Sequence, residues 1–249
     1  MDDYWSYILL VGVVFSALSI TVCLDNEKEI KIVLGSSSEA RKFMLDICNI
    51  EYIAISPNID EKAVDCEDPE ELPLEIAKAK TYELMKTLKG ENSILITSDQ
   101  VVLHDTIREK PENITQARKF LKSYSNSTVK TVTAVVVTNT FTGKSANIID
   151  ISTVYFKKIT EKDIDEICIS EYPANILEKT NNYIFIPTYM PMRRSINLTR
   201  EKISVLDCAG ALAIDHPVLL NKIKSIDGTF SSVMGLPLNK LFDLIDEVK

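Results

Sequence analysis

The sequence predicts one α/β domain over residues 29–249, preceded by a segment of different composition. Two observations lead to this prediction. Apolar runs with the length of strands alternate along the chain with amphipathic stretches that have helical spacing. In addition, 45% of the 249 residues are hydrophobic and 26% are charged, which is typical of a globular protein with a substantial core.

The first half of the domain is expected to alternate strands with helices. The predicted elements are a strand at 30–34, a helix at 39–48, a helix held within 68–89 and entered at Pro73, and a buried strand at 93–103. The polar residues Ser98, Asp99 and Gln100 interrupt the last of these runs and predict a break in the strand. A helix follows Pro111, with Asn113 as its cap and Gln116 three residues further on.

The second half continues the alternation after two strands rich in Val and Thr. The predicted elements are strands at 129–138, 146–157 and 222–226, a helix capped by Thr160 and Asp163, and a last helix opened by Pro237. Residues 173–207 have no sustained period and are interpreted as an inserted excursion.

The charge balance excludes one class of partner and leaves another open. With 36 acidic and 28 basic residues the net charge is −8, which argues against general affinity for a nucleic acid polymer. A small anionic ligand is still compatible, provided that local cations and a bound metal offset the overall field. The five cysteines are odd in number and show no zinc-site spacing, so unpaired thiols are expected. Only two histidines are present, so catalysis must rely on carboxylates, Lys and Arg.

The first 28 residues differ from the rest of the chain. The segment 8–24 is uncharged and almost wholly apolar, at the lower limit of length for crossing a bilayer. Asp2 and Asp3 precede it, where a signal peptide carries positive charge. Three interpretations stay open, namely a membrane signal-anchor, a cleaved secretory leader and a mispredicted first exon.

The first chemical motif joins a predicted strand to a predicted helix. Gly35 is followed by Ser36, Ser37 and Ser38, and Arg41 would stand at the third helical position if Ser38 is the cap. Free backbone N–H groups, hydroxyls and the helix dipole at such a junction suit a phosphate. Taken alone, the spacing slightly favours serines that only cap the helix and a solvated Arg41.

Carboxylates and lysines supply the other candidates. Asp99 follows an apolar run and could hold a metal or activate water at a strand end, or simply form a turn. Glu61, with its neighbour Asp60, lies in a polar loop where solvation is the default. Helical spacing does not single out Lys80, so an exposed side chain is the default there too. Lys110 precedes a helix start, which is unfavourable for a cation unless it faces an anion.

Taken in order, these segments resemble the Maf-like (septum formation) nucleotide pyrophosphatase family over residues 30–249. The matching motifs are Ile32 to Ser38 with Arg41, Asp60-Glu61, Ile76-Ala77 with Lys80, Ser98 to Val101, Lys110-Pro111 with Ala117-Arg118, Cys208-Ala209-Gly210, and Gly228 with Ser232-Val233 and Gly235 to Leu238. The stretch 177–206 has no counterpart in this family and is expected to be an insertion.

The resemblance implies a fold, a reaction and a set of site residues. It implies a mixed, twisted β-sheet flanked by helices, with two lobes around a cleft, and hydrolysis of nucleoside triphosphates to a monophosphate and pyrophosphate. The implied catalytic residues are Asp99, Lys80 and Lys110, the implied substrate contacts are Ser36, Ser38, Arg41, Gln100 and Asp215, and the implied metal ligands are Glu61 and Asp99. The implied cofactor is Mg²⁺ or Mn²⁺. A cytoplasmic house-cleaning enzyme that forms a homodimer is also implied.

Two further comparisons with the family refine this expectation. The chain is most similar to the branch that acts on 7-methyl-GTP, where an acidic group such as Asp215 suits a guanine edge or a cationic methylated ring. It departs from the family at Ala40, Glu75 and Glu109, which remove cations or add anions near the expected polyanion. A catalytically weakened nucleotide-binding protein of the same fold is therefore the alternative.

Overall fold

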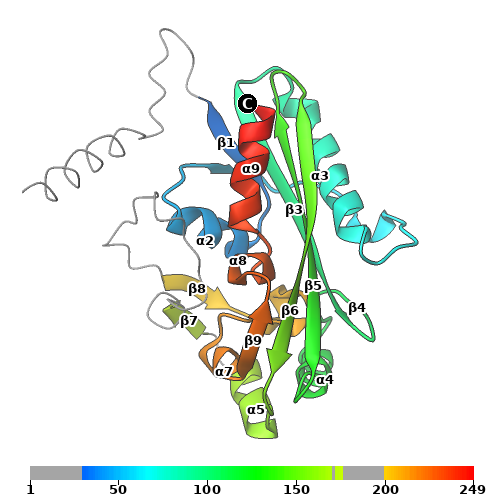
Figure 1. Ribbon diagram of the computed structural model, residues 1–249, viewed down its shortest axis with the longest axis vertical. Helices are drawn as coiled ribbons and strands as arrows, with labels where there is room; N and C mark the ends of the chain where they lie inside the picture. The colour runs from blue at the N-terminus through cyan, green and yellow to red at the C-terminus, as the bar shows by residue number, and fades with distance from the viewer. Residues whose placement is uncertain (1–29, 170–171, 176–198) are drawn as a thin grey trace, which may run out of the picture.

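The computed structural model describes residues 30–169, 172–175 and 199–249. Its main sheet consists of β1 (Lys31–Gly35), β2 (Ile53–Ala54), β3 (Ser93–His104), β4 (Thr106–Arg108), β5 (Thr128–Asn139), β6 (Ser145–Phe156) and β9 (Ile223–Asp227). The strand order is β2-β1-β3-β5-β6-β9, with β4 paired to the end of β3 (Figure 1). Because β1 is parallel to both of its neighbours and the remaining pairs are antiparallel, the predicted mixed sheet is confirmed.

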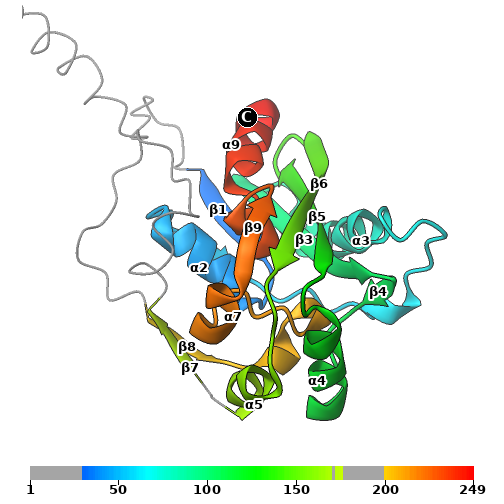
Figure 2. The same cartoon turned by 60° about the horizontal axis from the view of Figure 1, so that its bottom comes forward.

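Helices cover both faces of this sheet. The described helices are α2 (Glu39–Ile47), α3 (Leu72–Leu88), α4 (Ile114–Ser123), α5 (Glu161–Ile169), α7 (Pro217–Asn221), α8 (Phe230–Val233) and α9 (Leu238–Val248). Figures 1 and 2 show α3 on one side of the long strands and α9 on the other. On the α3 side, Leu84 and Leu88 pack against Val33 and Leu95. The larger core lies on the opposite side, where α2, α8 and α9 meet the sheet.

A second group of short elements forms the other lobe. It contains α4, α5 and α7 with two 3₁₀ turns, η2 (Val205–Asp207) and η3 (Ala209–Ala211), which contact one another (Figure 2). The small antiparallel pair of β7 (Tyr172–Asn175) and β8 (Thr199–Ile203) also belongs to this part of the chain. Apolar side chains of α4, α5 and α7, such as Leu121, Ile164 and Leu219, continue the main hydrophobic core, so the two lobes share one interior.

The predicted helix caps are confirmed by their hydrogen bonds. The side chain of Asn113 accepts from the backbone N–H of Gln116 at 3.0 Å, which fixes the start of α4. At the start of α5, the N–H of Asp163 donates to the hydroxyl of Thr160 at 3.2 Å, and the carboxylate of Asp163 accepts from the N–H of Thr160 at 2.7 Å. These reciprocal contacts satisfy N–H groups that a helix start leaves without partners.

The break predicted within the strand at 93–103 is wrong. The strand β3 runs without interruption from Ser93 to His104, and Ser98, Asp99 and Gln100 all pair in register with β5. Their backbone groups have ladder partners, so the polar side chains do not require a turn. The parallel neighbour β1 ends at Gly35, opposite Thr97. Asp99 therefore lies in mid-strand, just past the carboxyl end of β1, rather than at the end of its own strand.

The long helix begins at Leu72, with Pro73 in its first turn, as the predicted entry at Pro73 requires. Of the predicted insertion, residues 177–198 lie outside the described residues, and 199–206 contain β8 and the start of η2. The apolar segment 8–24 also lies outside them, and within the described part no helix is long and apolar enough to cross a bilayer. Cys48, Cys66 and Cys168 are free thiols, as expected.

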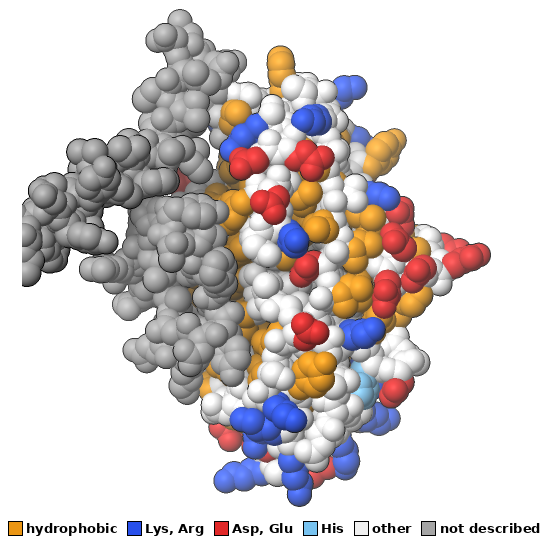
Figure 3. Space-filling view, in the orientation of Figure 1, with side chains coloured by type: hydrophobic (Ala, Val, Ile, Leu, Met, Phe, Trp, Pro, Cys, Tyr) orange, Lys and Arg blue, Asp and Glu red, His pale blue; other side chains and the backbone are white. Residues whose placement is uncertain are grey.

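Acidic and basic side chains are mixed over the face that Figure 3 shows. This face therefore does not present the uniform basic field on which binding of nucleic acid polymers depends.

Candidate active site

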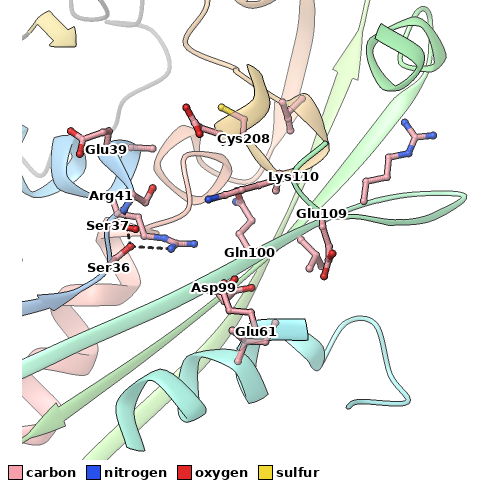
Figure 4. A pocket seen from close by; sticks show the side chains of 18 of the residues that line it. Ser36, Ser37, Glu39, Arg41, Glu61, Asp99, Gln100, Glu109, Lys110 and Cys208 are labelled. Atoms are coloured by element: carbon pink, nitrogen blue, oxygen red, sulfur yellow. Dashed lines mark hydrogen bonds between the residues drawn. The ribbon is translucent and has the colours of Figure 1, made fainter. Parts of the chain in front are cut away.

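A cleft of about 1040 Å³ separates the sheet and α3 from the lobe that contains α4 and η3. The side chains nominated from the sequence come from distant segments but all line this one cleft. They are Ser36, Ser38, Arg41, Glu61, Lys80, Asp99, Gln100, Lys110 and Asp215. Figure 4 shows Arg41 and Lys110 entering from opposite sides, above Asp99 and Glu61.

The junction between β1 and α2 forms one wall. The hydroxyl of Ser36 accepts hydrogen bonds from the backbone N–H of Ser38 at 3.1 Å and from Nη1 of Arg41 at 3.2 Å. Ser38 occupies the N-cap position, so Arg41 stands at the third helical position as predicted, but the Ser38 side chain makes no capping bond. The serines thus organise a cluster of donors around Arg41 rather than merely capping the helix.

Arg41 remains cationic within this wall. Burial lowers the pKa of its guanidinium, and the charges of Asp99 and Glu61 offset part of that effect. Since a guanidinium does not lose its proton in proteins, Arg41 presents a permanent positive charge to the cleft.

The floor of the cleft is built where α3 crosses β3. The hydroxyl of Thr97 donates to the carbonyl of Ala77 at 2.9 Å and lies 2.6 Å from the hydroxyl of Thr81, which ties the helix to the strand. Alternate residues of a strand share a face, so Asp99 faces the same helix as Thr97. Lys80, one turn after Ala77, is thereby brought onto Asp99.

Lys80 is buried, not exposed as its helical spacing suggested. It is only 4% exposed, and its Nζ lies 2.7 Å from Oδ1 of Asp99 and 2.7 Å from Oε1 of Glu61. Asp99 is itself 8% exposed, whereas Glu61 projects from the short 3₁₀ turn η1 (Glu61–Ala63) at the cleft edge. The structure therefore brings the two predicted metal ligands and a predicted phosphate contact into one ionic cluster.

The net field at the cleft edge is positive enough to keep Glu61 ionised. Partial burial alone would raise the pKa of Glu61. The hydrogen bond and charge of Lys80, with the charges of Lys110 and Arg41, outweigh burial and bring the pKa below the ordinary value of a glutamate.

Gln100 lines the cleft, but its amide NH₂ group serves the protein itself. Its Nε2 donates to the hydroxyl of Thr133 at 2.7 Å and to the carbonyls of Ser232 and Val233 at 2.9 and 3.2 Å. Through this group Gln100 anchors the end of α8, and its role in substrate contact stays a prediction. Ser98, on the same face of β3, donates to the carbonyl of Gly235 at 2.9 Å.

Sequence reasoning missed Ser98 and Gly235 as site residues. The carbonyl of Gly235 also accepts from Nε of Arg41 at 3.0 Å, so this one oxygen joins β3, α2 and the 232–235 segment. Both residues belong to the family motifs Ser98 to Val101 and Gly235 to Leu238, and a positive φ of 90° at Gly235 explains the glycine.

The opposite wall comes from the second lobe. Lys110 is exposed to the cleft, and the carbonyl of the adjacent Glu109 accepts from the N–H of Gly210 at 2.8 Å, which joins this wall to η3. Asp215, between η3 and α7, is 4% exposed and lines the same wall. Among the three departures from the family pattern, Ala40 and Glu109 line the cleft.

The third departure, Glu75, does not line the cleft. Its carboxylate lies 2.7 Å from Nζ of Lys78 one turn along α3. Its negative charge is therefore offset locally and lies away from the expected polyanion.

The donor set fits a hard divalent cation that is completed by a substrate. Among the described residues, no group of three or more His, Cys, Asp or Glu side chains is placed to enclose a metal. Asp99 and Glu61 nevertheless converge on one cation position, as their common contact with Lys80 shows. Mg²⁺ is commonly held by one or two carboxylates together with phosphate oxygens and water, so these two residues suffice.

The comparisons agree with this geometry. A sequence model of the Maf-like protein family matches residues 31–176 and 192–248. The chain belongs to the Maf-like protein family. It is 33% identical over 224 residues to the 7-methyl-GTP pyrophosphatase of Dictyostelium discoideum, which covers 87% of this chain and 96% of that protein. It is also 28% identical over 221 residues to the dTTP/UTP pyrophosphatase of Phocaeicola vulgatus, covering 88% and 96%.

Proposed function

We propose that this Maf-like protein hydrolyses nucleoside triphosphates between the α- and β-phosphates, giving a nucleoside monophosphate and pyrophosphate. One observation carries the proposal. In a single cleft, the Ser36–Arg41 donor cluster and Lys110 surround the ion cluster of Asp99 and Lys80. Cations placed around a carboxylate pair are what binding and cleavage of a triphosphate require. The names of the relatives support the same reaction.

The chain's own residues account for binding of the phosphates and for removal of a proton from the attacking water. Arg41, Lys80 and Lys110 bind the phosphates and offset the charge that develops on the leaving pyrophosphate. Asp99 orients a water molecule and accepts its proton as the water oxygen bonds to the α-phosphorus. The bond from the α-phosphorus to the bridging oxygen breaks, and that oxygen leaves with pyrophosphate.

We further propose that Glu61 and Asp99 hold Mg²⁺ or Mn²⁺ while the nucleotide is bound. When bound, the metal supplies Lewis-acid stabilisation of the phosphate oxygens. The donor set supports this proposal, because carboxylates and phosphate oxygens are the ligands that these hard cations prefer.

For the base we propose a guanine nucleotide modified at N7, as in 7-methyl-GTP. The buried residue Asp215 lines the cleft, and a carboxylate suits a cationic methylated ring or the N–H donors of guanine. The relative from Dictyostelium, at 33% identity, carries that substrate in its name.

The test is product analysis with the full chain. Mg²⁺ or Mn²⁺ is supplied, and 7-methyl-GTP, GTP, UTP, dTTP and CTP are compared by their yields of monophosphate and pyrophosphate. We expect equal amounts of both products, with 7-methyl-GTP the best substrate. Binding of nucleotides without any product would instead establish the catalytically weakened nucleotide-binding protein. Release of a nucleoside diphosphate and orthophosphate would contradict the proposed cleavage position.

A proposal on location and assembly rests on the family resemblance and not on the reaction. We propose a cytoplasmic homodimer, as the family resemblance implies, and a mass measurement of the purified full chain in solution tests the dimer. Membrane fractionation of cells that express the full chain tests whether residues 8–24 anchor it.

A further inference from the structure

The most enclosed cation in the cleft is the side chain of Lys80. Its ammonium group has three N–H donors, and three oxygens surround it. Oε1 of Glu61 and Oδ1 of Asp99 each lie 2.7 Å from Nζ, and the carbonyl oxygen of Ser98 lies at 3.4 Å. With its side chain only 5% exposed, this lysine is positioned as the counter-ion of both carboxylates.

This arrangement opposes the binding of a second cation between the two carboxylates. Each carboxylate already gives one oxygen to Lys80, and a divalent metal bound by both Glu61 and Asp99 would lie beside the ammonium and be repelled by it. Tight metal binding to the nucleotide-free protein therefore requires Lys80 to leave the cluster. Among the described residues, the polar contacts of Nζ are these three oxygens, so leaving costs the ammonium all of them.

A triphosphate removes that cost. Its oxygens offer acceptors of higher charge on the same side of the cleft, because Ser36 and Arg41 are placed to hold phosphates beside Asp99. Once the ammonium turns to a phosphate oxygen, Glu61 and Asp99 are free to bind the metal that the nucleotide carries.

We propose that Lys80 is an internal surrogate for the metal, which blocks the two carboxylates until a nucleotide draws it away. This inference rests on the proposed function, because it assigns the metal to Glu61 and Asp99. Metal and nucleotide are then positively coupled, and each tightens the binding of the other. Lys80 is a positioning residue for the metal in addition to a contact for phosphate. The device keeps the two carboxylates neutralised and in place in the empty protein.

The experiment measures Mn²⁺ binding to the full chain without nucleotide, by the electron paramagnetic resonance signal of free Mn²⁺. We expect the wild-type protein to bind Mn²⁺ weakly. Lys80→Gln should bind it at least tenfold more tightly, because the competing charge is gone while the carboxylates remain. Lys78→Gln is the matched control, since it removes the same charge from the same helix, where Lys78 pairs with Glu75. It should keep the wild-type affinity.

Two additions locate the effect and guard against misfolding. In Lys80→Gln, a second change of Glu61→Gln should return Mn²⁺ binding to the weak level, which assigns the new affinity to this cluster. Lys80→Met, whose apolar chain fills similar space, should behave as Lys80→Gln does, and thermal unfolding verifies that each variant is folded.

The outcomes separate this inference from the proposed reaction. Equal Mn²⁺ affinity of wild type and both Lys80 variants would overturn it, and so would micromolar binding of Mn²⁺ to the wild-type protein without nucleotide. The second outcome needs no variant. Neither result depends on turnover, so a protein that releases pyrophosphate but binds Mn²⁺ tightly alone would retain the proposed function and lose this inference. If the protein shows no turnover but Lys80→Gln binds Mn²⁺ more tightly than wild type, the inference is retained and the proposed function is lost.

Discussion

The carbonyl oxygen of Gly235 accepts a hydrogen bond from Nε of Arg41 at 3.0 Å, across 194 positions of sequence. The same oxygen accepts from the hydroxyl of Ser98 at 2.9 Å. One backbone group from the segment before α9 therefore fixes the orientation of the Arg41 guanidinium relative to β3, the strand that carries Asp99.

This relationship predicts the effect of Gly235→Ala. A Cβ at this position would lie 3.3 Å from Nε of Arg41, and φ at Gly235 is 90°, which strains any other residue. We expect Arg41 to shift and KM for the nucleotide to rise about tenfold, equivalent to about 1.4 kcal/mol of binding. Steady-state kinetics of pyrophosphate release measure this change.

Gly90→Ala is its matched control. Gly90 has a φ of 88°, so alanine suffers a similar backbone strain, on the order of 1–3 kcal/mol, but no atom lies within 4 Å of the new Cβ. If both variants lose similar stability but KM stays unchanged in Gly90→Ala, the raised KM of Gly235→Ala is assigned to the shift of Arg41. A raised KM in both variants would contradict the assignment.

Gln100→Glu tests the anchoring of the end of α8. The substitution replaces the donor NH₂ group with a carboxylate oxygen that faces the carbonyls of Ser232 and Val233. We expect the free energy of unfolding to fall by about 2–3 kcal/mol, measured by urea denaturation. Gln116→Glu should change little, because Gln116 accepts from the N–H of Glu112 and a carboxylate keeps that acceptor. An equal loss in both would disprove the anchoring role.

His216 predicts a dependence of stability on pH. Burial lowers the pKa of His216 to about 4, from 6.5 in the unfolded chain, and the side chain accepts from the N–H of Val218 at the start of α7. Between pH 6.5 and 4 the unfolded chain binds the extra proton, so stability is complete above pH 6.5 and falls as the pH drops through this window. The loss should reach about 3 kcal/mol.

The variant His216→Asn separates titration from capping. Asparagine keeps an acceptor at the N-cap of α7 but does not titrate, so this component of the pH dependence should disappear while stability at neutral pH is largely kept. Urea denaturation at pH 7 and pH 4.5 measures both effects. If the free energy of unfolding of His216→Asn falls between pH 7 and pH 4.5 as much as that of the wild type, other groups cause the acid sensitivity.

Most of the fold could be predicted because its signals are local. Strand runs such as 129–138, the helix caps at Asn113 and Thr160, and the glycine-serine junction before α2 each depend on neighbouring residues. The family motifs then brought the nominated residues to one cleft, and all nine line it.

The remaining features depend on contacts between distant segments. Lys80 stands at the edge of a helical stripe and resembles Lys78 in the sequence, but only Lys80 meets Asp99 and Glu61. The continuity of β3 through Ser98 and Gln100 likewise depends on pairing with β5 and on carbonyls in the 232–235 segment. Local propensity predicts a break there because it takes account of neither β5 nor these carbonyls.

The most direct test of the proposed reaction is pyrophosphate release from 7-methyl-GTP by the wild-type full chain and by Asp99→Asn, with Mg²⁺ present. Asp105→Asn, an exposed carboxylate near the end of the same strand, is the control for charge and folding. We predict that Asp99→Asn lowers kcat at least a hundredfold, on the scale of a lost general base, and that Asp105→Asn keeps wild-type activity. Wild-type activity in a folded Asp99→Asn protein would contradict the account.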